Sequence, residues 1–247
     1  MRLRLLTYNI HKGFNLGNRD FVLGLIKASI RETHATVVCL QEVIGEHGGH
    51  AKRVKDWPDQ SQFEFLADQT WSHYAYGKNA IYTEGHHGNA LLSKFPIVFW
   101  ENEDASLNSL ERRGFLHAMI EVPDFGKIHV ISIHLNLFER DRTMQLTQLC
   151  TRVKRLIPEN EPLFIAGDFN DWRQKASSIL NQELALKEVF LELNGNHAKT
   201  FPSLFPFFSL DRIYYRGLVC NSAQVIQSQL FRNLSDHLPL LAEFSRP

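Results

Sequence analysis

The chain has little cysteine and no long apolar run, and these two absences exclude several classes of protein. Its 247 residues include three cysteines, Cys39, Cys150 and Cys220, and no CxxC pair. An odd number of widely spaced cysteines is typical of free thiols in a reducing compartment rather than of a disulfide framework. No stretch approaches the roughly 20 apolar residues of a membrane span. The N-terminal segment MRLRLLTYNIHKGF becomes polar too soon for a signal peptide. We therefore expect a soluble, cytoplasmic protein without a transmembrane segment.

The chain also lacks an excess of positive charge. Its 27 lysines and arginines balance 27 aspartates and glutamates, so the formal net charge is zero. A protein that holds nucleic acid mainly by neutralising phosphates usually has a basic excess, although a local basic groove can hide within a neutral total. The charge balance therefore weakens a nucleic-acid function without excluding it. The apolar content of 44% is ordinary for a globular protein and suffices for a sizeable core.

Strand-like segments recur along the chain and alternate irregularly with helices. Runs of β-branched, aromatic and leucine residues predict strands over 3–10, 36–43, 88–97, 113–122, 127–135, 162–170, 211–217 and 239–244. Apolar periodicity predicts helices over 19–31, 139–157 and 176–193. Many neighbouring strands are close enough to be antiparallel, which favours sheets packed on each other and flanked by helices, an α/β sandwich. No boundary is evident, so we predict one domain over residues 1–247.

Two segments are predicted to be loops. The polar stretch 44–62 contains glycine and proline and is typical of a surface loop. The aromatic, proline-broken stretch FPSLFPFF at 201–208 is either a loop packed on the core or a contact for substrate or membrane, and we favour the core loop.

Several predicted strands end in polar residues suited to metal or phosphate chemistry. One such ending is unremarkable, but six are hard to explain by solvation alone, and the ends of strands in one sandwich can converge on one rim. These residues are Asn9, Glu42, His134, Asp168 with Asn170, Asp211, and Asp236 with His237.

The residue types favour a hard cation. Carboxylate and amide oxygens suit Mg²⁺ or Mn²⁺, and the absence of a cysteine ligand or an HExxH motif disfavours structural zinc. Glu42 is the candidate metal ligand, because a carboxylate buried at a strand end needs a cation. Asp168 is suited to orient or deprotonate a water. His237 is suited to bind phosphate or move a proton, with Asp211 fixing its tautomer.

Seven motifs, in this order, resemble the signature of the endonuclease/exonuclease/phosphatase superfamily: TYNIH, CLQE, GNALLSKFP, SIHL, GDFN, LDRIY and SDHLP. Each motif is weak alone, but the ordered set runs from Thr7 to Pro239. This superfamily includes deoxyribonuclease I, exonuclease III-type repair nucleases, inositol-polyphosphate 5-phosphatases and neutral sphingomyelinases. The resemblance implies a four-layer α/β sandwich, with two mostly antiparallel sheets face to face and helices outside. It also implies Mg²⁺-dependent hydrolysis of a phosphate ester at one rim.

The resemblance also implies roles for the metal residues. Glu42 would be the principal Mg²⁺ ligand. Asn9 would contact the metal-site network or the phosphate, and Asp236 would be an extra ligand or an orienting carboxylate.

The same resemblance implies roles for the residues that act on the phosphate. Asp168 would align the attacking water, and Asn170 would steady the pentacoordinate phosphate. His237, paired with Asp211, would bind or protonate the phosphate.

The chain resembles deoxyribonuclease I, the sphingomyelinases and the 5-phosphatases in having a histidine at position 134. This histidine argues against a dedicated abasic-site nuclease. His134 could protonate the leaving oxygen. His87 stands where some of these relatives have an acidic partner for that histidine, and Glu84 is a substitute candidate. Arg113 and Arg142 are candidates for contact with the substrate phosphate.

Three functions remain open. The first is a phosphodiesterase or phosphatase acting on a lipid head group or another small phosphate ester, which the neutral charge, His134 and segment 201–208 favour. The second is a deoxyribonuclease. The third is an inactive binding module, which the joint presence of all these polar residues disfavours. We expect a monomer without a stable protein partner.

Overall fold

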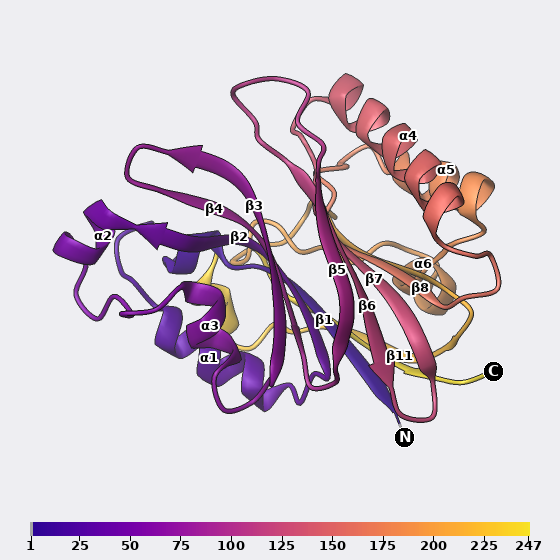
Figure 1. The fold of residues 1–247 in the computed structure, drawn as a ribbon, viewed down its shortest axis with the longest axis horizontal. Coiled ribbons are helices and arrows are strands. Elements are labelled where there is room, and N and C mark those ends of the chain that lie inside the picture. The colour runs from indigo at the N-terminus through magenta and orange to yellow at the C-terminus, as the bar shows by residue number, and fades with distance from the viewer. Residues whose placement is uncertain (1) are drawn as a thin grey trace.

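Within residues 2–247, twelve strands form two six-stranded sheets. The two sheets pack face to face (Figure 1). The computed structural model describes residues 2–247. The first sheet has the strand order β11–β12–β1–β2–β4–β3, and the second has the order β5–β6–β7–β8–β10–β9. The strands are Leu3–Asn9 (β1), Val37–His47 (β2), His73–Tyr82 (β3), Gly85–Ser93 (β4), Ile97–Asp104 (β5), Gly114–Val122 (β6), Gly126–His134 (β7), Leu163–Asp168 (β8), Lys187–Glu188 (β9), Asp211–Arg216 (β10), Val219–Val225 (β11) and Leu240–Ser245 (β12).

Helices cover the outer faces of both sheets, so the molecule has the predicted four layers of an α/β sandwich (Figure 1). Apolar side chains of α1, α3 and α7 pack on the first sheet, and those of α4 and α5 pack on the second. No helix within residues 2–247 has both the length and the apolar character needed to cross a membrane. The helices are Leu23–Glu32 (α1), Gly48–Arg53 (α2), Gln62–Ala67 (α3), Glu139–Leu156 (α4), Ala176–Leu184 (α5), Val189–Asn194 (α6) and Phe231–Leu234 (α7), with a 3-10 turn at His11–Gly13 (η1).

The sheets are mostly antiparallel, as predicted, but each has one parallel pair near its centre. β1 runs parallel to β2 through a connection that contains α1, and β7 runs parallel to β8 through α4. The carboxyl ends of parallel neighbours lie at the same edge of a sheet. Asn9 is therefore level with Gln41 in the first sheet, and His134 is level with Asp168 in the second. The parallel pairs bring the predicted polar strand ends together.

The core between the sheets is made by side chains that alternate along the inner strands. Leu5 and Val37 of the first sheet and Val130 and Phe164 of the second are fully buried in one apolar cluster. β1 and β12 pair in this layer, with Leu3 opposite Phe244, so the beginning and the end of the chain share the same core.

The structure corrects several predicted element boundaries. Segment 44–62 is not one loop, because β2 continues to His47 against β4 and α2 follows. Segment 176–193 is not one helix, because Ala185 adopts a left-handed conformation that ends α5 before β9 and α6. The strands β3, β5, β9 and β11 were not predicted, and each lies at the edge of its sheet. Edge strands expose part of their surface, so their sequences lack the clear apolar pattern of inner strands.

Gly167 in β8 permits a close approach between β8 and β7. Its φ of +148° is a conformation that side chains other than glycine rarely adopt, and a Cβ atom would lie 1.9 Å from the carbonyl oxygen of Ile133. The backbones of β7 and β8 therefore approach closely at this glycine, and the approach sets the position of the next residue, Asp168.

We expect Gly167→Ala to lower the free energy of unfolding by about 2–4 kcal/mol, because it adds both backbone strain and a clash with backbone atoms. Urea denaturation followed by circular dichroism measures the change. The matched control is Gly24→Ala in α1, where an added Cβ meets nothing within 4 Å. This control should raise the stability by up to about 1 kcal/mol. Equal effects of the two variants would contradict the role given to Gly167.

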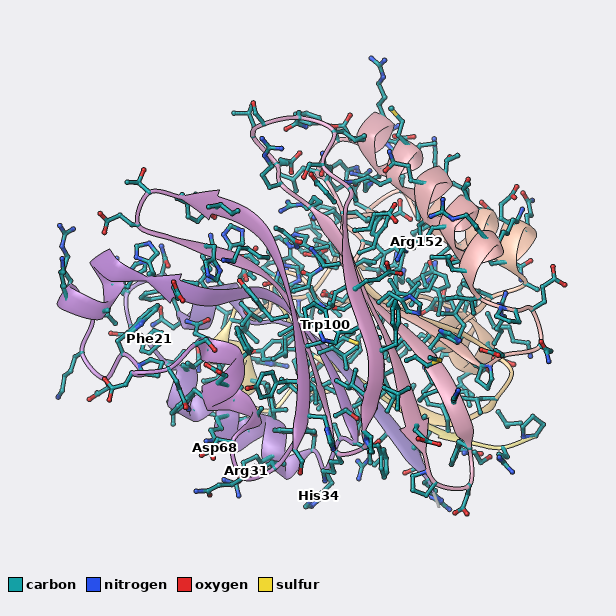
Figure 2. The ribbon with its side chains drawn as sticks, in the orientation of Figure 1. Phe21, Arg31, His34, Asp68, Trp100 and Arg152 are labelled. Carbon is teal, nitrogen blue, oxygen red and sulfur yellow. The ribbon has the colours of Figure 1, made fainter. Side chains whose placement is uncertain are left out.

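A buried polar network covers the outer face of the second sheet near β5. Arg152 of α4, which is labelled in Figure 2, forms ion pairs with Glu101 and Glu103 of β5. Nδ1 of His117 lies 3.7 Å from Oε1 of Glu101, and its Nε2 lies 2.9 Å from Nδ1 of His129. Burial and the neighbouring His129 lower the pKa of His117 to about 4, against the opposing effect of Glu101. His117 is therefore neutral in the folded protein near pH 6.

We expect the protein to lose stability as the pH falls from about 6.5 to about 4, because the pKa of His117 is lower in the folded state than in the unfolded state. As the pH falls, the unfolded chain binds this proton at a higher pH than the folded protein does. The difference lowers the free energy of unfolding by up to about 3 kcal/mol. The variant His117→Gln should show a flatter pH dependence in urea titrations over this range. An unchanged slope would exclude His117 as the source.

Candidate active site

A cleft of about 540 Å³ opens where the carboxyl ends of the two parallel strand pairs meet. Its polar lining consists of eight residues that the sequence predicted: Asn9, Glu42, Arg113, His134, Asp168, Asn170, Asp236 and His237. Asp211 is buried and is hydrogen-bonded to His237, so it belongs to the same group. The predicted convergence of the strand ends is therefore present in the structure.

Glu42 is turned toward the cleft by an irregularity in β2. The pairing with β4 shifts register between Leu40 and Val43, and Glu42 has a φ of +57°. Burial acts to raise the pKa of Glu42, but Nζ of Lys12, 3.6 Å from Oε2, and nearby histidines outweigh it and lower the pKa. Glu42 is therefore a carboxylate at neutral pH.

Asn9 connects the carboxylates of the two sheets. Its Nδ2 donates to Oε1 of Glu42 at 3.4 Å and to Oδ2 of Asp168 at 3.2 Å, while its Oδ1 accepts from the backbone N–H of His11. Asn9 was predicted among the metal-site residues. In this arrangement its amide nitrogen, rather than its oxygen, faces the carboxylates, so Asn9 holds them in place.

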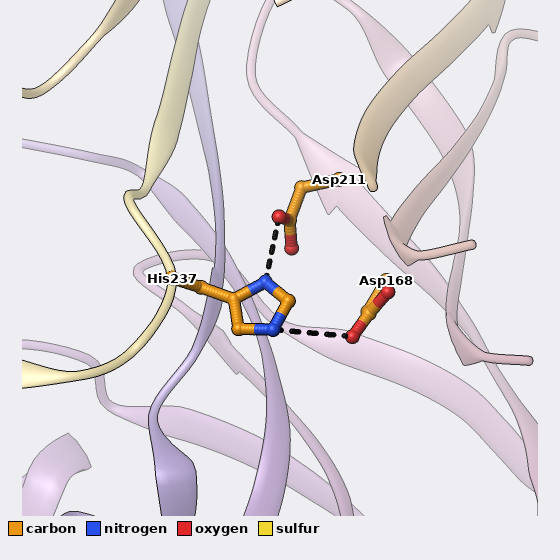
Figure 3. A group of neighbouring side chains, drawn as sticks. All are labelled: Asp168, Asp211 and His237. Carbon is orange, nitrogen blue, oxygen red and sulfur yellow. Dashed lines mark hydrogen bonds and ion pairs between the residues drawn. The ribbon is translucent and has the colours of Figure 1, made fainter. Parts of the chain in front are cut away.

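His237 lies between two buried carboxylates (Figure 3). Its Nδ1 is 2.8 Å from Oδ2 of Asp211, and its Nε2 is 3.7 Å from Oδ2 of Asp168. Burial disfavours the charged imidazole, but Asp211 and Asp168 outweigh it and raise the pKa of His237 to about 10. Thr200 also donates to Oδ2 of Asp211, at 2.5 Å. His237 is therefore a cation at neutral pH, held by the predicted pair with Asp211.

Asp168 lies at the centre of the cluster. Its Oδ1 accepts the backbone N–H of Asn170 at 2.9 Å, and its Oδ2 lies 3.5 Å from Nε2 of His134. Burial raises the pKa of Asp168 to about 6, although His237 opposes the shift. Burial, Arg113 and His237 together hold the pKa of His134 well below its usual value. His134 is therefore neutral at physiological pH.

The turn after β8 fixes the next two polar residues. Asn170 has a φ of +49°, and its Nδ2 donates to the carbonyl oxygen of Leu135 at 2.9 Å. Asp171 is buried and accepts the backbone N–H of Ala176 at the start of α5. Phe169, between Asp168 and Asn170, is fully buried in the outer core.

The two predicted phosphate-binding arginines differ in position. Arg113 lines the cleft, where its Nε donates to the carbonyl oxygen of Leu135 and its Nη2 contacts Glu111. Arg142 is buried outside the cleft lining, and its guanidinium lies 4.4 Å from the ring centre of Trp172. The structure thus corrects the prediction for Arg142, whose charge faces backbone carbonyl oxygens and an indole ring instead of the cleft.

The predicted partners of His134 occupy other positions. His87 contacts the hydroxyl of Tyr82, and burial lowers the pKa of His87 to about 4. Glu84 lies in the turn between β3 and β4, where its carbonyl oxygen accepts the N–H of Gly48. The carboxylate that His134 approaches is that of Asp168.

Segment 201–208, for which the sequence left a substrate contact open, supplies Phe201 and Phe208 to the cleft. Sequence reasoning missed the other apolar lining residues and two hydroxyl groups that position the polar residues. Thr200 supports Asp211, and Ser235 donates to the carbonyl oxygen of Asn9 at 2.7 Å while it accepts the N–H of His237. The apolar residues of the lining are Leu137, Trp172, Phe201, Phe208 and Leu210. Their only sequence signal is position, since they follow the strand-end motifs or lie in or beside the aromatic run.

The donor set fits a hard divalent cation. Glu42 presents a partly exposed carboxylate to the cleft, Asp236 lines the same cleft, and Oδ1 of Asp211 is buried without a hydrogen-bond partner. Ligand atoms of Asp168, Asp211 and His237 also lie within 4.8 Å of one another. However, both imidazole nitrogens of His237 face carboxylates in that group, which makes it an ion-pair cluster. Glu42 and Asp236 are therefore the better candidates for holding a cation.

The sequence and the fold match known proteins over nearly the whole of this chain. The chain is 48% identical over 241 residues to the uncharacterized protein YbhP of Escherichia coli K12, covering 97% of this chain and 95% of YbhP. An endonuclease/exonuclease/phosphatase from Beutenbergia cavernae superposes with a TM-score of 0.81 at 20% identity, covering 99% of this chain and 72% of that chain. The human nocturnin catalytic domain with a bound sulfate anion gives 0.77 at 21% identity, covering 100% and 94%.

A family model also matches the chain. The match spans residues 6–237 and therefore includes every strand-end residue of the cleft. The chain belongs to the endonuclease/exonuclease/phosphatase family.

Proposed function

We propose that the protein is a metal-dependent phosphoesterase that hydrolyses a phosphate ester by in-line attack of water. The observation that carries this proposal is the cationic His237, held between Asp211 and Asp168 in a cleft that also holds Glu42. A fixed positive group next to carboxylates suits a reaction in which a phosphate is bound and a water is activated. The family name covers nucleases and phosphatases, and both cleave phosphate esters.

Glu42 and Asp236 would hold the cation, which we infer to be Mg²⁺ or Mn²⁺ because both donors are hard oxygens. When bound, the cation would neutralise phosphate oxygens and stabilise the charge that develops in the transition state. Asn9 would keep Glu42 and Asp168 at their mutual distance through its two hydrogen bonds.

The remaining residues act on the phosphate and the water. His237 donates a hydrogen bond from Nε2 to a phosphate oxygen, and Asp211 keeps the proton on Nδ1. Asp168 orients the water and accepts its proton. Arg113 and Asn170 contact the phosphate from the cleft wall. His134 supplies a hydrogen bond to the leaving oxygen, and the negative charge of the bound phosphate favours its protonated form.

The substrate is a phosphodiester or phosphomonoester of a lipid or small molecule. The zero net charge disfavours a long polyanion as the preferred substrate. The human nocturnin catalytic domain, which has a similar fold, was solved with a bound sulfate anion, and this supports a tetrahedral oxyanion as a ligand.

We expect Glu42→Gln to lower the turnover of bis-p-nitrophenyl phosphate by a factor of about 10²–10³, because the substitution removes the main negative ligand. EDTA should abolish turnover by the native protein. MgCl₂ or MnCl₂ should raise the thermal unfolding temperature of the native protein more than that of the variant.

The matched control is Glu46→Gln, which changes an exposed residue of the same strand. It should keep both the activity and the metal-induced thermal shift. Metal-dependent turnover that survives in Glu42→Gln would exclude Glu42 as a ligand. Faster hydrolysis of plasmid DNA than of small esters would favour the deoxyribonuclease alternative.

We expect Asp211→Asn to lower turnover about 10²-fold, because His237 loses the carboxylate that keeps it charged. NMR titration of the ring nitrogens should show the pKa of His237 falling from about 10 toward the ordinary value. Thr200→Val serves as the control, since it removes one hydrogen bond to Asp211 and keeps the ion pair. A His237 that stays charged in Asp211→Asn would refute this role of Asp211.

A further inference from the structure

One wall of the cleft continues outward as an exposed apolar surface, which we call the apolar rim. Phe208 lines the cleft, and its ring packs on Phe207 with 4.2 Å between ring centres. These two adjoining rings therefore connect the cleft with the outer surface of the protein. It consists of Leu137, Phe138, Trp172, Leu204, Phe205, Phe207 and Phe208.

The rim side chains are unusually exposed for their size. Phe205 is 80% exposed, Phe138 is 71% exposed and Phe207 is 58% exposed. Single exposed apolar residues are common, but several large ones in the segments that line a binding cleft indicate an interaction site. The sequence prediction that segment 201–208 packs on the core is therefore only partly right, since Ser203 is buried and its neighbours Leu204 and Phe205 face outward.

Hydrogen bonds fix the position of the rim relative to the polar residues of the cleft. The backbone N–H of Ser203 donates to the backbone carbonyl oxygen of Asp236. The hydroxyl of Ser203 donates to the backbone carbonyl oxygen of Ser235. On the other side, Arg142 donates to the carbonyl oxygen of Leu137 and lies against the ring of Trp172. Arg142, which the sequence proposed as a contact for the substrate phosphate, thus supports two residues of the rim.

Exposed basic side chains flank the rim. Arg140 follows Phe138 by two residues, Arg173 follows Trp172 directly, and Lys199 precedes the aromatic segment. Arg173 and Lys175 share one acidic partner, Glu139, and Glu111, which contacts the backbone of Leu137, pairs with Arg113. Apolar side chains surrounded by lysine and arginine are the features that bind a protein to an anionic membrane surface.

The residue types favour lipid over nucleic acid. Leucine and phenylalanine without polar edges supply no hydrogen bonds to bases, although aromatic rings can stack on bases of a single strand. The rim contains leucines that cannot stack, and the whole chain has no net positive charge.

We propose that the apolar rim docks the protein on an anionic lipid bilayer, so that the phosphate of a lipid head group enters the cleft. The choice of substrate rests on the proposed phosphoesterase function, whereas the docking does not. Phe205 and Phe207 enter the interfacial region, the flanking basic residues meet anionic head groups, and the polar end of the cleft faces the membrane surface.

The test is sedimentation with vesicles of phosphatidylcholine alone or with one-fifth phosphatidylglycerol. The double variant Phe205→Ser/Phe207→Ser should lower partitioning onto the anionic vesicles by a factor of about 10 or more. The control double variant Leu25→Ser/Val219→Ser changes exposed apolar residues on α1 and on the edge strand β11 and should bind like the native protein. Thermal unfolding checks that both variants are folded.

The outcomes separate docking from catalysis. Glu42→Gln should bind the vesicles like the native protein, even though it loses turnover. Absence of native binding to anionic vesicles, or equal loss in both double variants, would overturn the docking proposal and leave the proposed hydrolysis intact. If the rim variant instead loses affinity for a single-stranded oligonucleotide in fluorescence anisotropy and keeps vesicle binding, the rim is a base-stacking surface and the lipid proposal fails.

Discussion

The cleft depends on the packing of two parallel strand pairs against each other. β1 and β2 bring Asn9 and Glu42 to one edge of the first sheet, and β7 and β8 bring His134 and Asp168 to the facing edge of the second. The hydrogen bonds of Asn9 to both Glu42 and Asp168 cross the gap between the sheets. If the pairing of β1 with β2 or of β7 with β8 slipped by a single residue, side chains of the slipped strand would point to the opposite face of the sheet, because strand side chains alternate. The apolar core between the sheets therefore sets the geometry of the polar site.

Electrostatic balance is the second condition for this site. Several carboxylates lie close together with little water, and burial disfavours every charge there. His237 offsets two of the carboxylates, and Lys12 partly offsets Glu42. Burial is the main cause of the raised pKa of Asp168, and it outweighs the opposing effect of His237. A cleft with residual negative charge at its polar end and positive groups such as Arg113 at its wall is suited to a cation and an anion bound together.

The sequence predicted the inner strands and the polar strand ends, and it missed the parts that carry weak local patterns. β1, β2, β7, β8 and β10 are buried on both faces, so their apolar runs are clear. The four edge strands, β3, β5, β9 and β11, have mixed or short apolar patterns. They are identified only by their hydrogen bonds to neighbouring strands. The position of the Arg142 side chain depends on contacts with Trp172 and with backbone carbonyl oxygens, and motif spacing does not predict such contacts. Hydrogen-bonded supports such as Ser235 were likewise invisible, because serine occurs in many turns.

The pairing of β1 with β12 has a consequence for the order in which the molecule can fold. Ser235 bonds to the backbone of Asn9, so the first strand and the segment before β12 meet at the cleft. Strand β1 has one neighbour, β2, that is near it in the sequence and one, β12, that is far from it. His237, just before β12, reaches Asp211 and Asp168 only when this long-range pairing has formed. The polar site is therefore completed late in folding, because contacts between distant parts of a chain cost more chain entropy than local ones.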